Sequence, residues 1–112
     1  MKTLADFKKR IKPGVKLACI FHQASGGRDE KGQLILIDED RGTREINIVQ
    51  TNSFTLLTPQ KQDPTKLVDS WLNFPKASEV KILDKDTILI MCQDFRGHDP
   101  KLIPLCTYKF VA

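Results

Sequence analysis

The stretch Val15-Lys16-Leu17-Ala18-Cys19-Ile20-Phe21-His22 decides the fold. Every second residue from Val15 to Phe21 is apolar, and this period of two is typical of a half-buried β-strand. Further strands are predicted over residues 34–37, 46–48, 54–56, 67–74, 80–82, 88–92 and 106–110. We therefore predict a mainly β protein with a minor α part, built as a small antiparallel β-barrel or a highly curved sheet of seven to eight short strands.

One helix precedes these strands. Thr3 and Asp6 have the spacing of a capping box, in which each side chain bonds the backbone N–H of the other residue. An apolar stripe at helical spacing follows, formed by Leu4, Phe7 and Ile11. Pro13-Gly14 then ends the helix. We predict a helix over residues 3–12 and a β-rich body over residues 15–111, within a single domain that covers residues 1–112.

Turn-forming residues separate the predicted strands. We expect breaks or loops at residues 25–28, 38–43, 51–52, 59–66, 84–86 and 93–104. Residues 34–37 are continuously apolar, which predicts a strand more fully buried than the others. Residues 67–74 fit either a helix capped by Thr65 or a strand that ends before Pro75, and we predict the strand.

Composition places the chain among ordinary globular domains. Hydrophobic residues make up 40% and charged residues 29% of its 112 residues, so disorder and a coiled coil are not expected. The longest apolar run, residues 88–92, is far shorter than the roughly 20 residues that span a membrane. Charged residues near Met1 leave no apolar core for a signal peptide. We expect a cytoplasmic protein without a membrane partner.

The three cysteines support the same location. Their number is odd, and they lack Cys-x-x-Cys spacing. Apolar stretches surround all three, Cys19, Cys92 and Cys106. They are expected to be buried thiols rather than members of a disulfide framework. Such cysteine usage is typical of a reducing compartment such as the cytoplasm.

Positive charge is concentrated near the N-terminus. Residues 1–23 hold six basic groups and one acidic group, a net charge of +5, whereas the whole chain carries +4. A basic helix face can contact phosphates or steer an acidic partner, or it can simply keep a protein soluble. The candidate binding residues are Lys8, Lys9, Arg10, Lys12, Lys16, Arg41 and Arg44. Trp71, with Ser70 before it and Asn73 two residues after it, is a candidate exposed anchor for a partner.

Catalytic and metal-binding patterns are weak. Cys19 and His22 point to opposite faces if they share a strand, so buried thiols and surface histidines explain the zinc-type residues, among them Cys92, His98 and Cys106. A nucleophile elbow is absent from the sequence. A metal-dependent nuclease is a distant alternative, with candidate residues Asp69, Glu79 and Lys81. We predict a non-enzymatic protein with no metal and no cofactor.

Three segments resemble a known group of proteins. They are residues 12–16, residues 49–54 (Val-Gln-Thr-Asn-Ser-Phe) and residues 70–80 (Ser-Trp-Leu-Asn-Phe-Pro-Lys-Ala-Ser-Glu-Val). In these segments the chain resembles short uncharacterised proteins encoded by phages and prophages. The resemblance covers about half of the chain. It implies a mobile-element accessory protein in a bacterial cytoplasm, and it assigns no activity to any residue.

These observations together predict a binding module that acts by occupancy. The expected ligand is a protein partner, such as a host nucleic-acid-handling or defence factor, toward which the basic helix steers association. The alternative is direct nucleic-acid binding through the basic residues. The sequence leaves the oligomeric state open.

Overall fold

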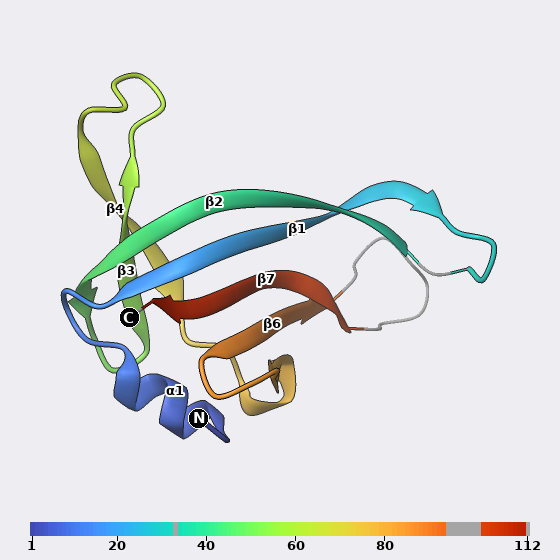
Figure 1. The fold of residues 1–112 in the computed structure, drawn as a ribbon, viewed down its shortest axis with the longest axis horizontal. Coiled ribbons are helices and arrows are strands. Elements are labelled where there is room, and N and C mark those ends of the chain that lie inside the picture. The colour runs from blue at the N-terminus through green and yellow to red at the C-terminus, as the bar shows by residue number, and fades with distance from the viewer. Residues whose placement is uncertain (33, 94–101, 112) are drawn as a thin grey trace.

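The computed structural model describes residues 1–32, 34–93 and 102–111. In these residues one helix, a short 3₁₀ segment and seven strands follow one another (Figure 1): α1 (Leu4–Arg10), β1 (Lys16–Arg28), β2 (Leu34–Val49), β3 (Ser53–Pro59), β4 (Leu67–Asn73), η1 (Ala77–Glu79), β5 (Val80–Ile82), β6 (Thr87–Gln93) and β7 (Leu102–Val111). The strands form one antiparallel sheet in the order β4-β3-β2-β1-β7-β6-β5. The predicted mainly β fold is confirmed as a curved sheet, which does not close into a barrel.

The predicted loop at residues 38–43 is wrong, because these residues lie inside β2. Asp38 pairs with His22 and Gly42 pairs with Cys19 across the β1–β2 ladder. The turn-forming residues serve a β-bulge instead: Gly42 has a φ of +71°, and its N–H donates to Asp40 Oδ1 at 2.8 Å. The two strands predicted over 34–37 and 46–48 are therefore one strand of 16 residues, so β2 is not short.

The break predicted at residues 25–28 is also wrong, because β1 continues to Arg28. Its pairing with β7 ends at Phe21↔Cys106, so the distal β1–β2 hairpin extends beyond the rest of the sheet (Figure 1). In this extension Ile35 and Ile37 are 45% and 58% exposed. The expected burial is therefore wrong for Ile35 and Ile37, whereas Leu36 is half-buried.

The other strand predictions are confirmed. Of the ambiguous residues 67–74, all but Phe74 form strand β4, which pairs with β3 along its whole length. The hairpin of β5 and β6 turns at residues 84–86, as expected. The last strand, predicted over 106–110, begins earlier, at Leu102. Most of the predicted loop at 93–104, including His98, lies outside the described residues.

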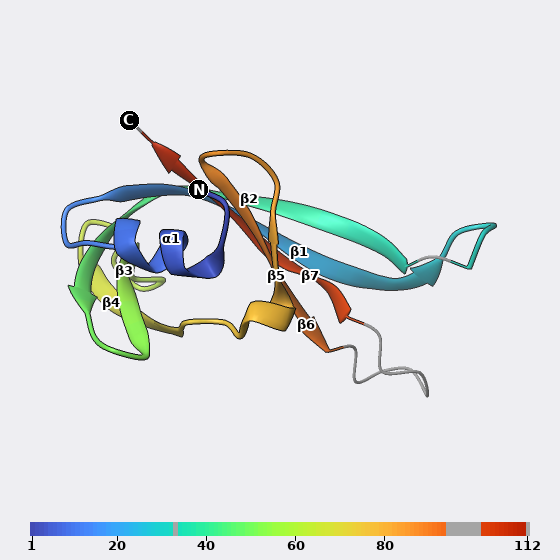
Figure 2. The same ribbon diagram turned by 90° about the horizontal axis from the view of Figure 1, so that it is seen from below.

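Helix α1 fills the hollow of the curved sheet (Figure 2). It is shorter than the predicted 3–12, because Thr3 and Ile11 have extended backbones and act as its caps. Phe7 is fully buried, and its ring packs 5.7 Å from that of Phe110 and 6.5 Å from that of Phe74, measured between ring centroids. The core therefore lies between α1 and the inner face of the sheet, which we define as the face that carries Leu17, Ile46 and Phe54.

The capping box gives the fold a pH-dependent element. Hydrogen bonds from the backbone N–H groups of Lys2 and Thr3 lower the pKa of the Asp6 carboxyl below its ordinary value. A lowered folded-state pKa adds stability above the ordinary value of 3.8, and this stability is lost as pH falls through the folded-state pKa. Acidification below about pH 4 is therefore expected to lower the urea midpoint more in the wild type than in Asp6→Asn. Equal losses in the two proteins would contradict this role of Asp6.

Candidate functional site

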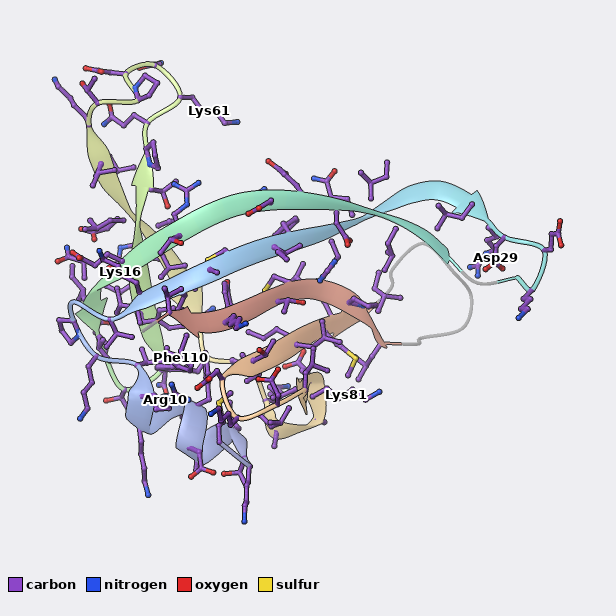
Figure 3. All side chains as sticks on the ribbon, in the orientation of Figure 1. Arg10, Lys16, Asp29, Lys61, Lys81 and Phe110 are labelled. Carbon is purple, nitrogen blue, oxygen red and sulfur yellow. The ribbon has the colours of Figure 1, made fainter. Side chains whose placement is uncertain are left out.

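The predicted basic residues do not form one continuous surface. Arg10 is held within the fold, because it donates to the carbonyl of Lys85 at 2.8 Å and to Asp86 Oδ1 at 3.1 Å. Its guanidinium also lies 4.0 Å from the ring centroid of Phe110 (Figure 3). These contacts attach α1 to the β5–β6 turn. Arg10 thus has a structural role that the sequence pattern does not reveal.

The remaining cations near α1 are exposed but scattered. Lys8 lies over the ring of Phe74, with its Nζ 5.4 Å from the centroid. Lys9 and Lys12 are exposed, on α1 and just after it. Lys16 is on the outer face at the start of β1, directly opposite Glu45 of β2. This carboxylate reduces the positive field that Lys16 presents to a ligand.

Arg41 and Arg44 lie apart from the helix, on β2. Arg44 pairs in register with the buried Leu17, which places it on the inner face. Arg41 stacks on Phe21 at 4.3 Å and contacts Glu39 Oε2 at 3.4 Å. The sequence analysis grouped these two arginines with the basic helix, but in the structure both line a pocket to which the helix contributes no residue.

This inner pocket has a volume of about 100 Å³. Its wall combines the two arginines with hydroxyl, thiol and apolar groups from five strands: Cys19, Ile20, Phe21, Leu56, Thr58, Ser70, Leu72, Cys106 and Tyr108. Burial raises the pKa of the Cys19 thiol to about 11 and also raises those of Cys106 and Tyr108. At neutral pH these three groups are therefore uncharged, and the arginines carry the only charges of the wall.

The buried thiols predict a loss of stability in alkali. A raised folded-state pKa adds stability below the ordinary thiol value of 9.0, and this stability is lost as pH rises toward about 11. Between pH 9.0 and about 11, the Cys19 thiol ionises in the unfolded state but not in the folded state. The urea midpoint is expected to fall over this range, and to fall less in Cys19→Ala. A midpoint that falls equally in both proteins would contradict the contribution of Cys19.

Trp71 is exposed, as predicted. It is 52% exposed on the outer face of β4, and Leu67, four residues earlier on the same face, is 56% exposed. Between them Asp69 Oδ1 accepts hydrogen bonds from Thr55 Oγ1 at 3.0 Å and from Asn47 Nδ2 at 2.9 Å. We call Leu67, Asp69 and Trp71 the Trp71 surface. Its supporting polar network is a feature that sequence reasoning missed.

The residues of the nuclease alternative lie in separate parts of the sheet. Asp69 is on edge strand β4, whereas Lys81 is on the opposite edge strand, β5. Glu79 accepts a hydrogen bond from the backbone N–H of Lys76 within η1. Each carboxylate is thus engaged locally, and no described contact joins Asp69 to Glu79 or Lys81.

The zinc-type residues are also separated. Cys19 faces inward, whereas His22 lies on the outer face, with Nδ1 2.6 Å from Asp38 Oδ1 and Nε2 2.8 Å from Thr107 Oγ1. The imidazole is only 13% exposed, so the expectation of a surface histidine is wrong for His22. In residues 1–32, 34–93 and 102–111, no cluster of three or more His, Cys, Asp or Glu residues is arranged to hold a metal ion.

Comparison with known proteins adds no assignment. No family model, curated protein or solved structure matches the chain. Among the described residues, none of the helical segments has the length and apolar character needed to cross a membrane. Two features of the structure therefore carry the functional argument: the Trp71 surface and the inner pocket.

Proposed function

We propose that the protein is a non-enzymatic binding module that acts by occupying a surface of a protein partner. The observation that carries this proposal is the exposure of Trp71 on an edge strand. Exposed tryptophan is costly to solvate and is enriched among the residues that contribute most to protein interfaces. Leu67 extends the apolar area on the same face of β4.

The setting of Trp71 suits a protein ligand. Strand β4 pairs with β3 on one side and ends the sheet on the other, so an extended segment of a partner can add to this edge. The bonds from Thr55 and Asn47 to Asp69 hold the middle of the strand in place. A surface held in this way loses little conformational entropy on binding.

The distribution of charge favours a protein partner over a nucleic acid. A phosphate backbone is best followed by a continuous row of cations. Here Arg10 is engaged with Asp86, and Arg41 and Arg44 line an inner pocket to which α1 contributes no residue. The exposed Lys9 and Lys12 remain available to steer an acidic partner through long-range attraction.

The resemblance to short phage and prophage proteins supplies a context for this proposal. In that context the partner is a factor of the bacterial host, such as one that handles nucleic acid or takes part in defence. Such a role requires binding alone, in keeping with a protein that acts by occupancy.

Selection from a library of displayed random peptides tests the proposal. Peptides that bind the Trp71→Ser variant are removed first, and the remaining peptides are selected on the immobilised wild type. In a parallel experiment, single- and double-stranded oligonucleotides are titrated into the wild type. We expect the selection to enrich apolar peptides that compete with one another for one site. Oligonucleotide binding with a steep log-linear salt dependence, without peptide enrichment, would instead support the nucleic-acid alternative.

A further inference from the structure

The sheet opens between β2 and β3. Only two positions of these strands pair, Ile46↔Leu56 and Val49↔Phe54, whereas β2 continues along β1 to residue 34. Beyond the Ile46↔Leu56 pair, the β3–β4 hairpin turns away from the rest of the sheet (Figure 1). The inner pocket lies in this opening, between Arg44 of β2 and Thr58 and Ser70 of the hairpin.

Arg44 occupies the centre of the opening. It lines the inner pocket and also a second hollow on the outer side, which is formed with Lys16, Thr43, Glu45, Leu57, Pro59 and Leu67. Arg44 is partly buried, yet its side chain makes no hydrogen bond or ion pair with any residue that the structure describes. A half-buried guanidinium has lost part of its hydration, and an anion with matching acceptors would compensate for that loss.

The rest of the inner wall is suited to the same kind of ligand. Arg41 is held in place by its stacking on Phe21, while Glu39, its ion-pair partner, is not part of the wall. No carboxylate is among the lining residues. The hydroxyl group of Ser70 adds a donor, and Leu56 and Leu72 supply apolar wall beside it.

We propose that the inner pocket is a binding site for a single oxyanion group, a carboxylate or a phosphate, held by Arg44 together with Arg41 and Ser70. A guanidinium presents paired N–H donors that match the oxygens of either group. The pocket volume of about 100 Å³ leaves room for one such group. The site does not depend on the Trp71 surface, so the two proposals can fail separately.

Nuclear magnetic resonance of the full chain tests this site directly. Inorganic phosphate and acetate are added to ¹⁵N-labelled protein against sodium chloride of equal ionic strength, and the Nε–H signals of Arg41 and Arg44 are followed. We expect saturable shifts of both signals. Arg44→Gln is expected to weaken the anion affinity, read from Arg41, by about tenfold or more. Lys61→Gln removes the same charge from an exposed position outside the pocket, and it should leave the affinity unchanged.

A second variant covers the case in which Arg44→Gln fails to fold, as judged by thermal unfolding. Arg44→Lys keeps the charge but loses the paired donors, and a smaller loss of affinity is expected. The proposal would be overturned if the Nε–H signals shifted with ionic strength alone. It would also be overturned if the wild type and both Arg44 variants bound the anion with equal affinity.

A competing peptide distinguishes the two sources of the anion. A short peptide with one glutamate and its glutamine counterpart are added to the phosphate-bound protein. Displacement by the glutamate peptide alone would support the site and indicate a partner's acidic side chain as its ligand. Phosphate binding without displacement would support the site and indicate a free anion. Absence of binding by phosphate, acetate and peptide would overturn the site and leave the proposal for Trp71 untouched.

Discussion

Replacing Phe7 by alanine is expected to lower the free energy of unfolding by about 3–5 kcal/mol. Phe7 is fully buried, and its ring packs against the rings of Phe74 and Phe110. An alanine would leave a cavity between the helix and the inner face of the sheet. Since small domains have about 5–15 kcal/mol of stability in total, this loss is a large part of the stability of the fold.

Urea denaturation followed by circular dichroism measures this effect, with Lys9→Ala as the control. Lys9 is on the same helix but exposed, so the control changes the helix without removing core contacts. A loss below about 1 kcal/mol in Phe7→Ala, similar to that of a surface substitution, would mean that α1 does not complete the core.

Replacing Trp71 by alanine is expected to weaken partner binding by about 30-fold or more, which corresponds to about 2 kcal/mol. The side chain is 52% exposed and lies on an edge strand, where a partner can bury it. The same change is expected to affect folding little, because core contacts of β4 are made from its other face, by Leu72. The measurement is the affinity of a peptide obtained by selection on the wild type.

Leu83→Ala is the matched control for Trp71→Ala. Leu83 is 53% exposed, close to the value for Trp71, but it lies beside the β5–β6 turn at the other edge of the sheet. If the two substitutions weaken peptide binding equally, Trp71 is not the anchor. If neither weakens it, the partner binds elsewhere.

Local patterns of sequence were sufficient for most elements. The alternation from Val15 to Phe21 predicted a strand, and Leu17 and Cys19 are buried as that alternation requires. The capping box of Thr3 and Asp6 predicted where α1 begins. These predictions depend only on neighbours in the chain, which is why they needed no knowledge of the tertiary structure.

The errors fall where pairing with a distant strand overrides a local signal. Asp40 and Gly42 have the composition of a turn, but pairing with β1 uses the same residues for a bulge within β2. Likewise, Ile35 and Ile37 are apolar enough for a buried strand, yet the hairpin extends beyond β7 and leaves them exposed.

The candidate site was predictable only in part. The exposure of Trp71 was predicted from the nearby polar residues Ser70 and Asn73. The inner pocket does not follow from any pattern, because it requires the register that sets Arg44 opposite Leu17 and the divergence of β3 from β2. The distribution of charge in the sequence pointed to Arg41 and Arg44 but grouped them with α1, which contributes no residue to the inner pocket.

The most direct test of the central claim is the fluorescence of Trp71, the only tryptophan in the chain. A selected peptide is titrated into the wild type while the emission maximum is recorded, with an oligonucleotide titrated in parallel. The account predicts a saturable shift of the emission to shorter wavelength with the peptide, because binding removes the indole from water. Peptide binding that leaves the emission unchanged, or a shift caused by the oligonucleotide alone, would contradict it.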